Sequence, residues 1–163
     1  MKKLFDMSPV AHPCAMIAAI YVALTYAFAP ISFAAMQVRI AEALTILPVF
    51  TPAAIPGLFV GCVLGNLLGG AVVPDIIFGS LATLAGAFFT WKLRHAHPFL
   101  YPVPPILANV LVVPFVLRYA YGAEEAIPFL MLTVGIGEVL SCGVLGLLLY
   151  YALRGKKDRI FRI

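Results

Sequence analysis

Charged residues are scarce in this chain, and their scarcity excludes most soluble folds. Only 11% of its 163 residues are Asp, Glu, Lys or Arg, whereas 63% are hydrophobic and the mean hydropathy is +1.05. Soluble domains average roughly 25% charged residues. A chain of this composition folded in water would leave too much apolar surface exposed. The composition therefore favours an integral membrane protein.

Other absences narrow the chemistry. The three cysteines, Cys14, Cys62 and Cys142, are odd in number and form no CxxC pair, so we expect neither a disulfide framework nor a metal site. The sequence has no Walker A glycine loop with which to hydrolyse ATP. It also has no HExxH motif and no evident pairing of a nucleophile with a base. We therefore expect a protein that is not an enzyme and needs no cofactor.

Long apolar runs are what the sequence does contain, and they predict transmembrane helices. Strands of a membrane barrel would alternate apolar and polar residues, which these runs do not. A spanning helix needs about 20 apolar residues. Proline, glycine and short polar stretches divide the chain into six segments without a linker, so residues 1–163 are expected to form a single domain. The segments cover about residues 10–29, 38–50, 54–68, 74–93, 106–121 and 127–153.

The basic residues predict the orientation of these segments. With six helices and a cytoplasmic N-terminus, nine of the 11 Lys and Arg residues fall on the cytoplasmic side, as the positive-inside rule requires. Five helices would put the Lys92 loop and the basic tail on opposite sides. A cleaved signal peptide is the competing interpretation of the first segment, but no clear cleavage site follows it. The expected fold is an all-α membrane bundle of six helices with both termini in the cytoplasm.

Ionisable residues inside the apolar segments are the first functional candidates, because a charge at the bilayer centre costs about 2.5–3.5 kcal/mol. Arg39 and Glu42 lie three residues apart in the second segment. They either pair with each other or serve a ligand. Glu138 has no basic neighbour and follows Gly135 and Gly137. We favour a ligand role for Glu138, with pairing to Arg39 from another helix as the alternative.

Three more polar residues complete this set of candidates. Asp75 begins the fourth segment directly after Pro74, where a carboxylate also suits the helix dipole. Asn66 and Asn109 lie within apolar runs. Each amide either hydrogen-bonds another helix or contacts a polar ligand.

Small residues recur every four positions along the first segment. Residues at this spacing share one face of a helix, and small side chains let another helix approach closely. That helix could belong to a partner protein or to the same bundle, and the spacing does not decide between them. The stripe consists of Ala11, Ala15, Ala19, Ala23 and Ala27.

Four blocks of the sequence closely resemble the QueT family. They are APISFAAMQVRIAEALTILPVFTPAAIPGLFVGCVLGNLLGG, DIIFGSLATLAGAFFTWKLR, PPILANVLVVPFVLRY and VGIGEVLSCGVLGLLL. The resemblance implies the substrate-binding S component of an energy-coupling factor (ECF) transporter, with six helices and cytoplasmic termini in a bacterial cell membrane. It implies a queuosine precursor as substrate, and a membrane coupling subunit and two ATPases as partners. It also implies that Ala15, Ala19 and Ala23 contact the coupling subunit.

A queuosine precursor of the 7-deazaguanine or queuine type suits the polar candidates. Its adjacent N–H groups could be accepted by Glu138 or Glu42. Asn66 or Asn109 could serve its carbonyl edge, and Asp75 could meet an aminomethyl cation. Two other classes stay open: a secondary transporter that works alone through Glu42 or Glu138, and a membrane enzyme or assembly subunit without transport activity.

Overall fold

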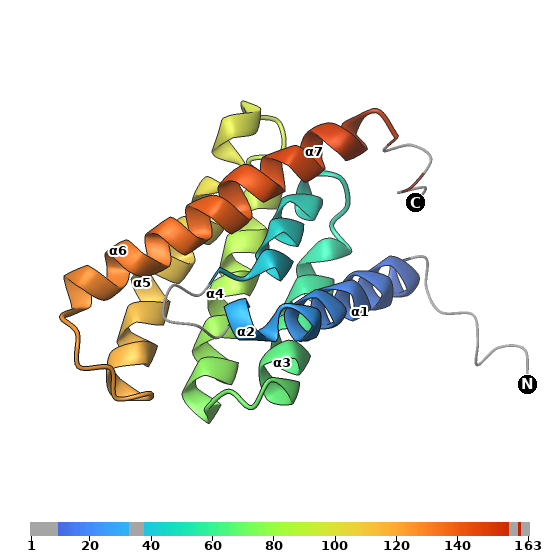
Figure 1. Ribbon diagram of the computed structural model, residues 1–163. Coiled ribbons are helices and arrows are strands. Elements are labelled where there is room, and N and C mark those ends of the chain that lie inside the picture. Colours follow the sequence, from blue (N-terminus) through green and yellow to red (C-terminus); the bar gives the residue numbers. More distant parts are fainter. Residues whose placement is uncertain (1–9, 33–37, 157–159, 161–163) are drawn as a thin grey trace, which may run out of the picture.

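The computed structural model describes residues 10–32, 38–156 and 160, and the regular structure in these ranges is helical (Figure 1). A short helix, α2 (Ala29–Ser32), follows α1 (Ala11–Ala27), and a 3₁₀ helix, η2 (Ile40–Val49), leads to α3 (Ala54–Leu68). Next come α4 (Val73–Lys92), the 3₁₀ turn η3 (Pro98–Leu100) and α5 (Val103–Tyr119). The last elements are α6 (Ile127–Glu138), the π-helix η4 (Val139–Leu145) and α7 (Gly146–Arg154).

Three helical stretches are long and apolar enough to cross a membrane. They cover Val73–Lys92, Pro98–Tyr119 and Ile127–Arg154, with 20, 22 and 28 residues. The third is continuous because η4 joins α6 to α7 (Figure 1). The helices Ala11–Ala27, Ile40–Val49 and Ala54–Leu68 are also apolar but shorter. The predicted class, an all-α membrane bundle, is confirmed, whereas these lengths leave the number of spans and the side of each terminus as predictions.

The six predicted segments coincide with helices, and α3 has the predicted bounds. The second segment differs in kind, because it is a 3₁₀ helix with Pro48 inside it rather than an α-helix. Its residues Ala41 to Pro48 are all buried, and it contacts α1, α3, α4, η4 and α7. At about 2.0 Å per residue, ten 3₁₀ residues reach about 20 Å. This short segment therefore extends a long way through the bundle and is shielded by the other helices.

A row of glycines on α3 lets α1 approach closely. A Cβ atom at Gly57 would lie 2.8 Å from the Cys14 carbonyl oxygen, and one at Gly61 would lie 2.8 Å from Tyr21 Cβ. One at Gly65 would lie 3.3 Å from the Thr25 hydroxyl. Small residues at membrane helix interfaces allow such close backbone packing. This interface brings Tyr21 into the interior of the bundle.

The alanine stripe lies on the outer face of α1. Ala15, Ala19 and Ala23 are exposed, whereas the buried face of this helix consists of Ile17, Ala18, Tyr21 and Thr25. The three alanines line a groove of about 600 Å³ together with residues of α3 such as Val60 and Leu64. Packing inside the bundle therefore does not explain the stripe, and contact with a partner protein stays a prediction.

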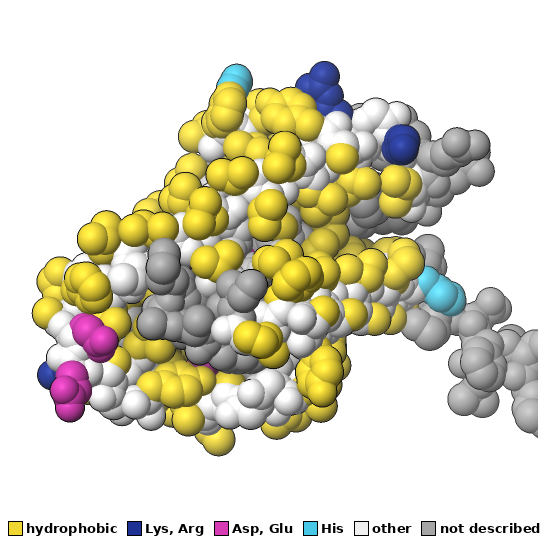
Figure 2. All heavy atoms as spheres, viewed as in Figure 1, with side chains coloured by type: hydrophobic (Ala, Val, Ile, Leu, Met, Phe, Trp, Pro, Cys, Tyr) yellow, Lys and Arg dark blue, Asp and Glu magenta, His cyan; other side chains and the backbone are white. Residues whose placement is uncertain are grey.

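Hydrophobic side chains cover most of the face shown in Figure 2, and charged side chains gather at its ends. The acidic ones lie near the α5–α6 loop, which contains the exposed Glu124 and Glu125. Arg118 is also at this end, where its Nη1 donates to the Ala123 carbonyl at 2.6 Å. Most of the Lys and Arg atoms visible in Figure 2 lie at the opposite end. The apolar surface between the two ends suits a lipid environment.

Candidate functional site

The helices enclose a connected cluster of polar side chains. All six polar residues singled out from the sequence belong to it, and none of them is more than 7% exposed. They come from the start of η2, from α3, α4 and α5, and from the end of α6. Each buried polar group needs a partner, because an unsatisfied one costs free energy in an apolar interior. The six residues are Arg39, Glu42, Asn66, Asp75, Asn109 and Glu138.

Arg39 forms one part of the cluster by joining α3 to α4. Its Nη2 lies 3.3 Å from Asp75 Oδ2, and its Nη1 donates to Asn66 Oδ1 at 3.1 Å. Asn66 in turn donates from Nδ2 to the Asp75 backbone carbonyl at 3.4 Å. Breaking a buried ion pair by removing one partner typically costs about 3–5 kcal/mol. This arrangement therefore fixes the segment before η2 against the middle helices, and it provides Asp75 with a cation from the protein itself.

Tyr121 extends this part of the cluster to the end of α5. Its hydroxyl donates to Asp75 Oδ2 at 2.9 Å and accepts the Val72 N–H at 3.4 Å. Partial burial, with the neighbouring Asp75 carboxylate as the next cause, raises the pKa of Tyr121. The phenol therefore stays protonated at neutral pH and remains a donor to Asp75.

Glu42 forms the second part of the cluster. The Tyr21 hydroxyl and the Thr83 hydroxyl both donate to Glu42 Oε1, the latter at 3.2 Å. The other oxygen, Oε2, is buried and has no hydrogen bond of ordinary geometry from the described residues. The Asn109 side chain lies close enough to interact with the carboxylates of both Glu42 and Glu138. One oxygen of Glu42 is thus held in place by two hydroxyl groups, whereas the other has no such hydrogen bond from the described residues.

Glu138 lies beside Glu42 at the point where the helix changes its winding. The π-helix η4 begins directly after Glu138 and carries Cys142, whose thiol donates to Glu138 Oε2 at 3.2 Å. The same thiol lies 3.5 Å from the Glu42 backbone carbonyl and 3.4 Å from the Thr45 hydroxyl. Single-turn π segments frequently occur at functional sites. Here the π segment is the part of the last long helix that packs against η2.

Glu42, Glu138 and Cys142 also form the type of group that can hold a metal ion. One ligand atom from each lies within 4.8 Å of the others, and all three residues are buried. The sequence did not indicate this grouping, because 96 residues separate the two glutamates. The Cys142 thiol is engaged as a hydrogen-bond donor, whereas a metal-bound cysteine is deprotonated. The same three groups can therefore act as hydrogen-bonding groups with the thiol protonated, or as metal ligands once it is deprotonated.

Both pairings that the sequence left open for Arg39 differ from what the structure shows. Arg39 forms its ion pair with Asp75, and no ion pair to Glu42 or Glu138 occurs within the part of the chain described. The sequence pattern did not predict Tyr21, Thr83 and Cys142 as partners of the glutamates. The sequence offered only a weak indication for Tyr21: it lies four residues from Ile17 and from Thr25, so the three share one face of α1.

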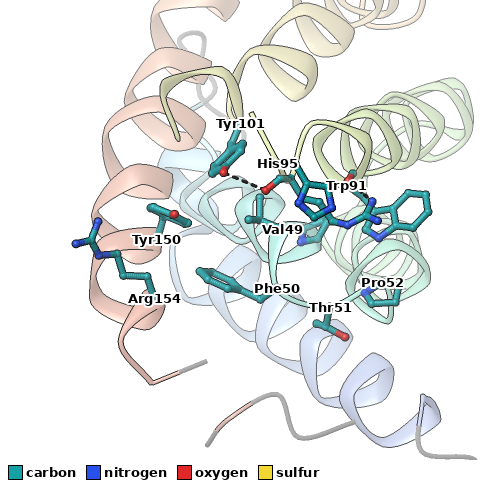
Figure 3. Close-up of a pocket in the computed structure, with 11 residues that line it drawn as sticks. Val49, Phe50, Thr51, Pro52, Trp91, His95, Tyr101, Tyr150 and Arg154 are labelled. Atoms are coloured by element: carbon teal, nitrogen blue, oxygen red, sulfur yellow. Dashed lines mark hydrogen bonds between the residues drawn. The ribbon is translucent and has the colours of Figure 1, made fainter. Parts of the chain in front are cut away.

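A cavity of about 580 Å³ is lined by other residues of the bundle, which Figure 3 shows. Aromatic rings line much of it: Phe50 stacks on Tyr150 at 5.4 Å, and the Arg94 guanidinium lies 4.4 Å from the Trp91 ring centre. The Tyr101 hydroxyl donates to the Arg94 carbonyl at 3.1 Å. None of the six polar candidates lines this cavity. Its place beside α7 and the end of α4 puts it at the basic end of the bundle.

A buried cluster of carboxylates, amides and one guanidinium inside an apolar helical bundle is typical of membrane proteins that bind or carry polar solutes. The fold and the apolar surface are those of a helical membrane protein. The chain belongs to the QueT transporter family, whose model matches residues 12–155. No curated protein and no solved structure matches the chain.

Proposed function

We propose that this chain is the substrate-binding S component of an ECF transporter and that it takes up a queuosine precursor of the 7-deazaguanine type. Membership of the QueT transporter family supports a transport role. The observation that carries the proposal is the buried pair Glu42 and Glu138. Their carboxylates can accept N–H groups of a small polar ligand, as charge-assisted hydrogen bonds that are stronger than neutral ones.

The rest of the cluster suits the same role. Asn109 lies next to both glutamates and can donate to or accept from a ligand edge. Arg39, Asn66 and Asp75 form a bonded group beside it. We propose that this group positions η2 and the ligand site, and that Asp75 does not bind a cationic substituent itself because Arg39 already neutralises it.

The outer face of α1 supports the proposal of a coupling partner. Ala15, Ala19 and Ala23 present small side chains at the surface, next to a groove formed with α3. A helix of a membrane coupling subunit could approach closely there. In this proposal the two ATPases supply the energy, the chain crosses a bacterial cell membrane six times, and both termini lie in the cytoplasm.

Ligand binding by the purified chain tests the proposed substrate. Isothermal titration would compare a 7-deazaguanine with thiamine, riboflavin and biotin, and we expect saturable binding of the deazaguanine alone. Tight binding of one of the vitamins instead would contradict the proposed substrate.

Uptake in cells tests the proposed mechanism. We expect accumulation of labelled 7-deazaguanine to require the coupling subunit and both ATPases. Uptake that survives deletion of the ATPases would show a secondary transporter, in which Glu42 or Glu138 carries a coupling proton.

A further inference from the structure

The aromatic cavity of Figure 3 lies where the ends of several helices meet, at the basic end of the bundle. It measures about 580 Å³, and its walls come from the end of η2, from the end of α4 with the turn after it, and from α7. The described residues that line it include Arg94, His95 and Arg154 but no Asp or Glu. The charge of this lining is therefore positive, and the polar cluster around Glu42 does not account for it.

Arg94 is the basic group that the structure holds most firmly in this cavity. Its Nη1 donates to the Trp91 carbonyl at 3.0 Å, and its guanidinium lies 4.4 Å from the Trp91 ring centre. A guanidinium carries five N–H donors, so one bond to a carbonyl leaves donors for a ligand. None of the described residues forms an ion pair with Arg94, since the ion pair found among them joins Arg39 to Asp75.

Tyr101 fixes the turn that carries Arg94. The Tyr101 side chain is buried, and its hydroxyl lies within hydrogen-bonding distance of the carbonyls of Arg94, at 3.1 Å, and Ala96, at 3.0 Å. The Thr90 hydroxyl of α4 donates to the Tyr101 carbonyl at 3.0 Å. A group that is already held in place loses less entropy when it binds a ligand. The turn therefore presents a preorganised guanidinium to the cavity.

Other donors surround the same cavity. The Thr51 hydroxyl is buried and accepts the Ala53 N–H at 3.3 Å, so its own O–H is a further donor. The His95 imidazole has an N–H in either protonation state. The exposed Arg154 guanidinium lies 5.2 Å from the Tyr151 ring at the edge of the cavity. Several donors without a carboxylate suit an anion with several oxygens, and phosphate matches the fork of an arginine.

The surroundings of the cavity favour a phosphate that belongs to a lipid. Trp and Tyr rings are enriched at the level of the lipid headgroups, and Trp91 and Tyr101 line this cavity. Lys92 Nζ lies 5.2 Å from the Trp91 ring centre, and Phe88 and Phe89 are exposed on α4 just before it. Basic pockets between membrane helices bind anionic headgroups. A headgroup in the cavity leaves its acyl chains to lie along this apolar face of α4.

We propose that the aromatic cavity binds the phosphate of an anionic phospholipid headgroup and that Arg94 contacts this phosphate. This is a second binding site, and it does not depend on which solute the buried polar cluster binds. A soluble phosphate ester shares the phosphate but lacks the acyl chains. An acidic segment of a partner protein shares only the charge.

Trp91 reports directly on the cavity, because it is the single tryptophan of the sequence. We expect titration of dioctanoyl phosphatidylglycerol into the purified full-length chain, in a neutral detergent, to change Trp91 fluorescence saturably. The affinity should be at least tenfold higher than that for dioctanoyl phosphatidylcholine. Equal affinity for the two lipids would overturn the proposal, because the cavity would then not select an anion.

Inorganic phosphate and glycerol 3-phosphate separate a lipid from a soluble anion. We expect neither to change Trp91 fluorescence in the concentration range over which phosphatidylglycerol saturates. Saturation by either of them in that range would show a site for a soluble phosphate and would overturn the assignment to a lipid.

Variants of Arg94 locate the phosphate. In Arg94→Gln we expect the preference for phosphatidylglycerol over phosphatidylcholine to fall at least tenfold, and in Arg94→Lys to fall less, because the charge remains while the fork is lost. A ratio of two affinities on one variant cancels a general loss of folded protein. Arg118→Gln is the matched control, since Arg118 is exposed at the opposite end and also donates to a backbone carbonyl. An unchanged preference in Arg94→Gln would overturn the proposal.

Assembly separates the lipid from a partner protein. We expect the Arg94→Gln chain to co-purify with the proposed coupling subunit and ATPases as the unmodified chain does. Lost assembly together with an unchanged preference for phosphatidylglycerol would assign the cavity to an acidic segment of a partner, and would overturn its assignment to a lipid.

Discussion

Arg39 and Glu42 lie three residues apart, yet they bond different residues, and only α4 is shared between them. Arg39 bonds Asn66 of α3 and Asp75 of α4, whereas Glu42 bonds Tyr21 of α1 and Thr83 of α4. The extended backbone at Arg39, with φ −88° and ψ 96°, precedes the 3₁₀ helix and separates the directions of the two side chains. At the residue scale, the cluster therefore contains a neutralised part around Arg39 and an acidic part around Glu42.

Tyr21 is the residue that supports Glu42 from α1, and its hydroxyl can be removed alone. Tyr21→Phe keeps the ring but loses the hydrogen bond to Glu42 Oε1. Loss of a hydrogen bond to a buried group costs about 1–3 kcal/mol. We expect ligand affinity to fall about 5- to 150-fold, at about tenfold per 1.4 kcal/mol, as measured by isothermal titration.

Tyr26→Phe is the matched control for Tyr21→Phe, because Tyr26 lies on the same helix and is 72% exposed. It should bind the ligand as the unmodified chain does. If Tyr21→Phe melts at the normal temperature and binds with unchanged affinity, Tyr21 does not orient Glu42 for the ligand.

At the element scale, the apolar runs and the proline, glycine and polar residues between them predicted where helices lie. They did not predict whether each is an α-helix, a 3₁₀ helix or a π-helix. The bounds of α3 follow from Thr51-Pro52 before it and Gly69-Gly70 after it, and these signals are local. The 3₁₀ winding of η2 and the π winding of η4 depend on packing between elements, since Thr45 on η2 meets Cys142 on η4 across 97 residues. The meeting of Glu42 and Glu138 depends on the same contact. Polar residues of the site could therefore be identified from the sequence, whereas their partners could not.

The α1–α3 interface depends on the absence of a side chain at Gly61. A Cβ atom there would lie 2.8 Å from Tyr21 Cβ and 3.1 Å from Ala18 Cα. Overpacking of this kind typically costs about 1–3 kcal/mol. We expect Gly61→Ala to lower the melting temperature in detergent and to weaken ligand binding, because Tyr21 must move away from Glu42.

Gly155→Ala serves as the control for Gly61→Ala, since a Cβ at Gly155 meets no atom within 4 Å and its φ is −78°. It should leave both melting temperature and affinity unchanged. A Gly61→Ala protein as stable as the Gly155→Ala protein would mean that α1 and α3 have room to separate.

The exposed alanine stripe predicts a different effect on the opposite face of α1. Ala19→Trp should weaken assembly with the coupling subunit, because the bulky ring prevents close approach of the two helices. Ligand binding by the isolated chain should survive, since Ala19 is exposed and lies on the face away from Tyr21. Co-purification of the subunits measures the first effect, and isothermal titration measures the second.

Ala85→Trp is the matched control for Ala19→Trp, because it adds the same ring at an exposed alanine of α4. We expect this protein to assemble normally. Normal assembly of the Ala19→Trp protein as well would show that the coupling subunit binds elsewhere.

At the scale of the whole molecule, the distribution of charge gives the bundle a direction. Asp75, Glu124 and Glu125 lie toward one end, and Lys92, Arg94 and Arg154 lie toward the other. The positive-inside rule assigns the basic end to the cytoplasm. The buried cluster extends from Asp75, at the start of α4, to Thr83, near its middle, so a ligand would reach it from the acidic, outer side. The aromatic cavity of Figure 3 would then face the cytoplasm.

Cysteine labelling in intact cells tests this orientation. Glu124→Cys lies at an exposed position in the α5–α6 loop, and Lys156→Cys lies at an exposed position after α7. A membrane-impermeant maleimide should label the first in intact cells, and the second only after permeabilisation. The unsubstituted chain is the control, because Cys62 and Cys142 are buried and Cys14 is half-buried in α1. The continuous stretch Ile127–Arg154 is long and apolar enough to span the membrane once, and one span there puts the two positions on opposite sides. Labelling of both from the outside would contradict that span, and labelling of Lys156→Cys alone would reverse the orientation and place the acidic end in the cytoplasm.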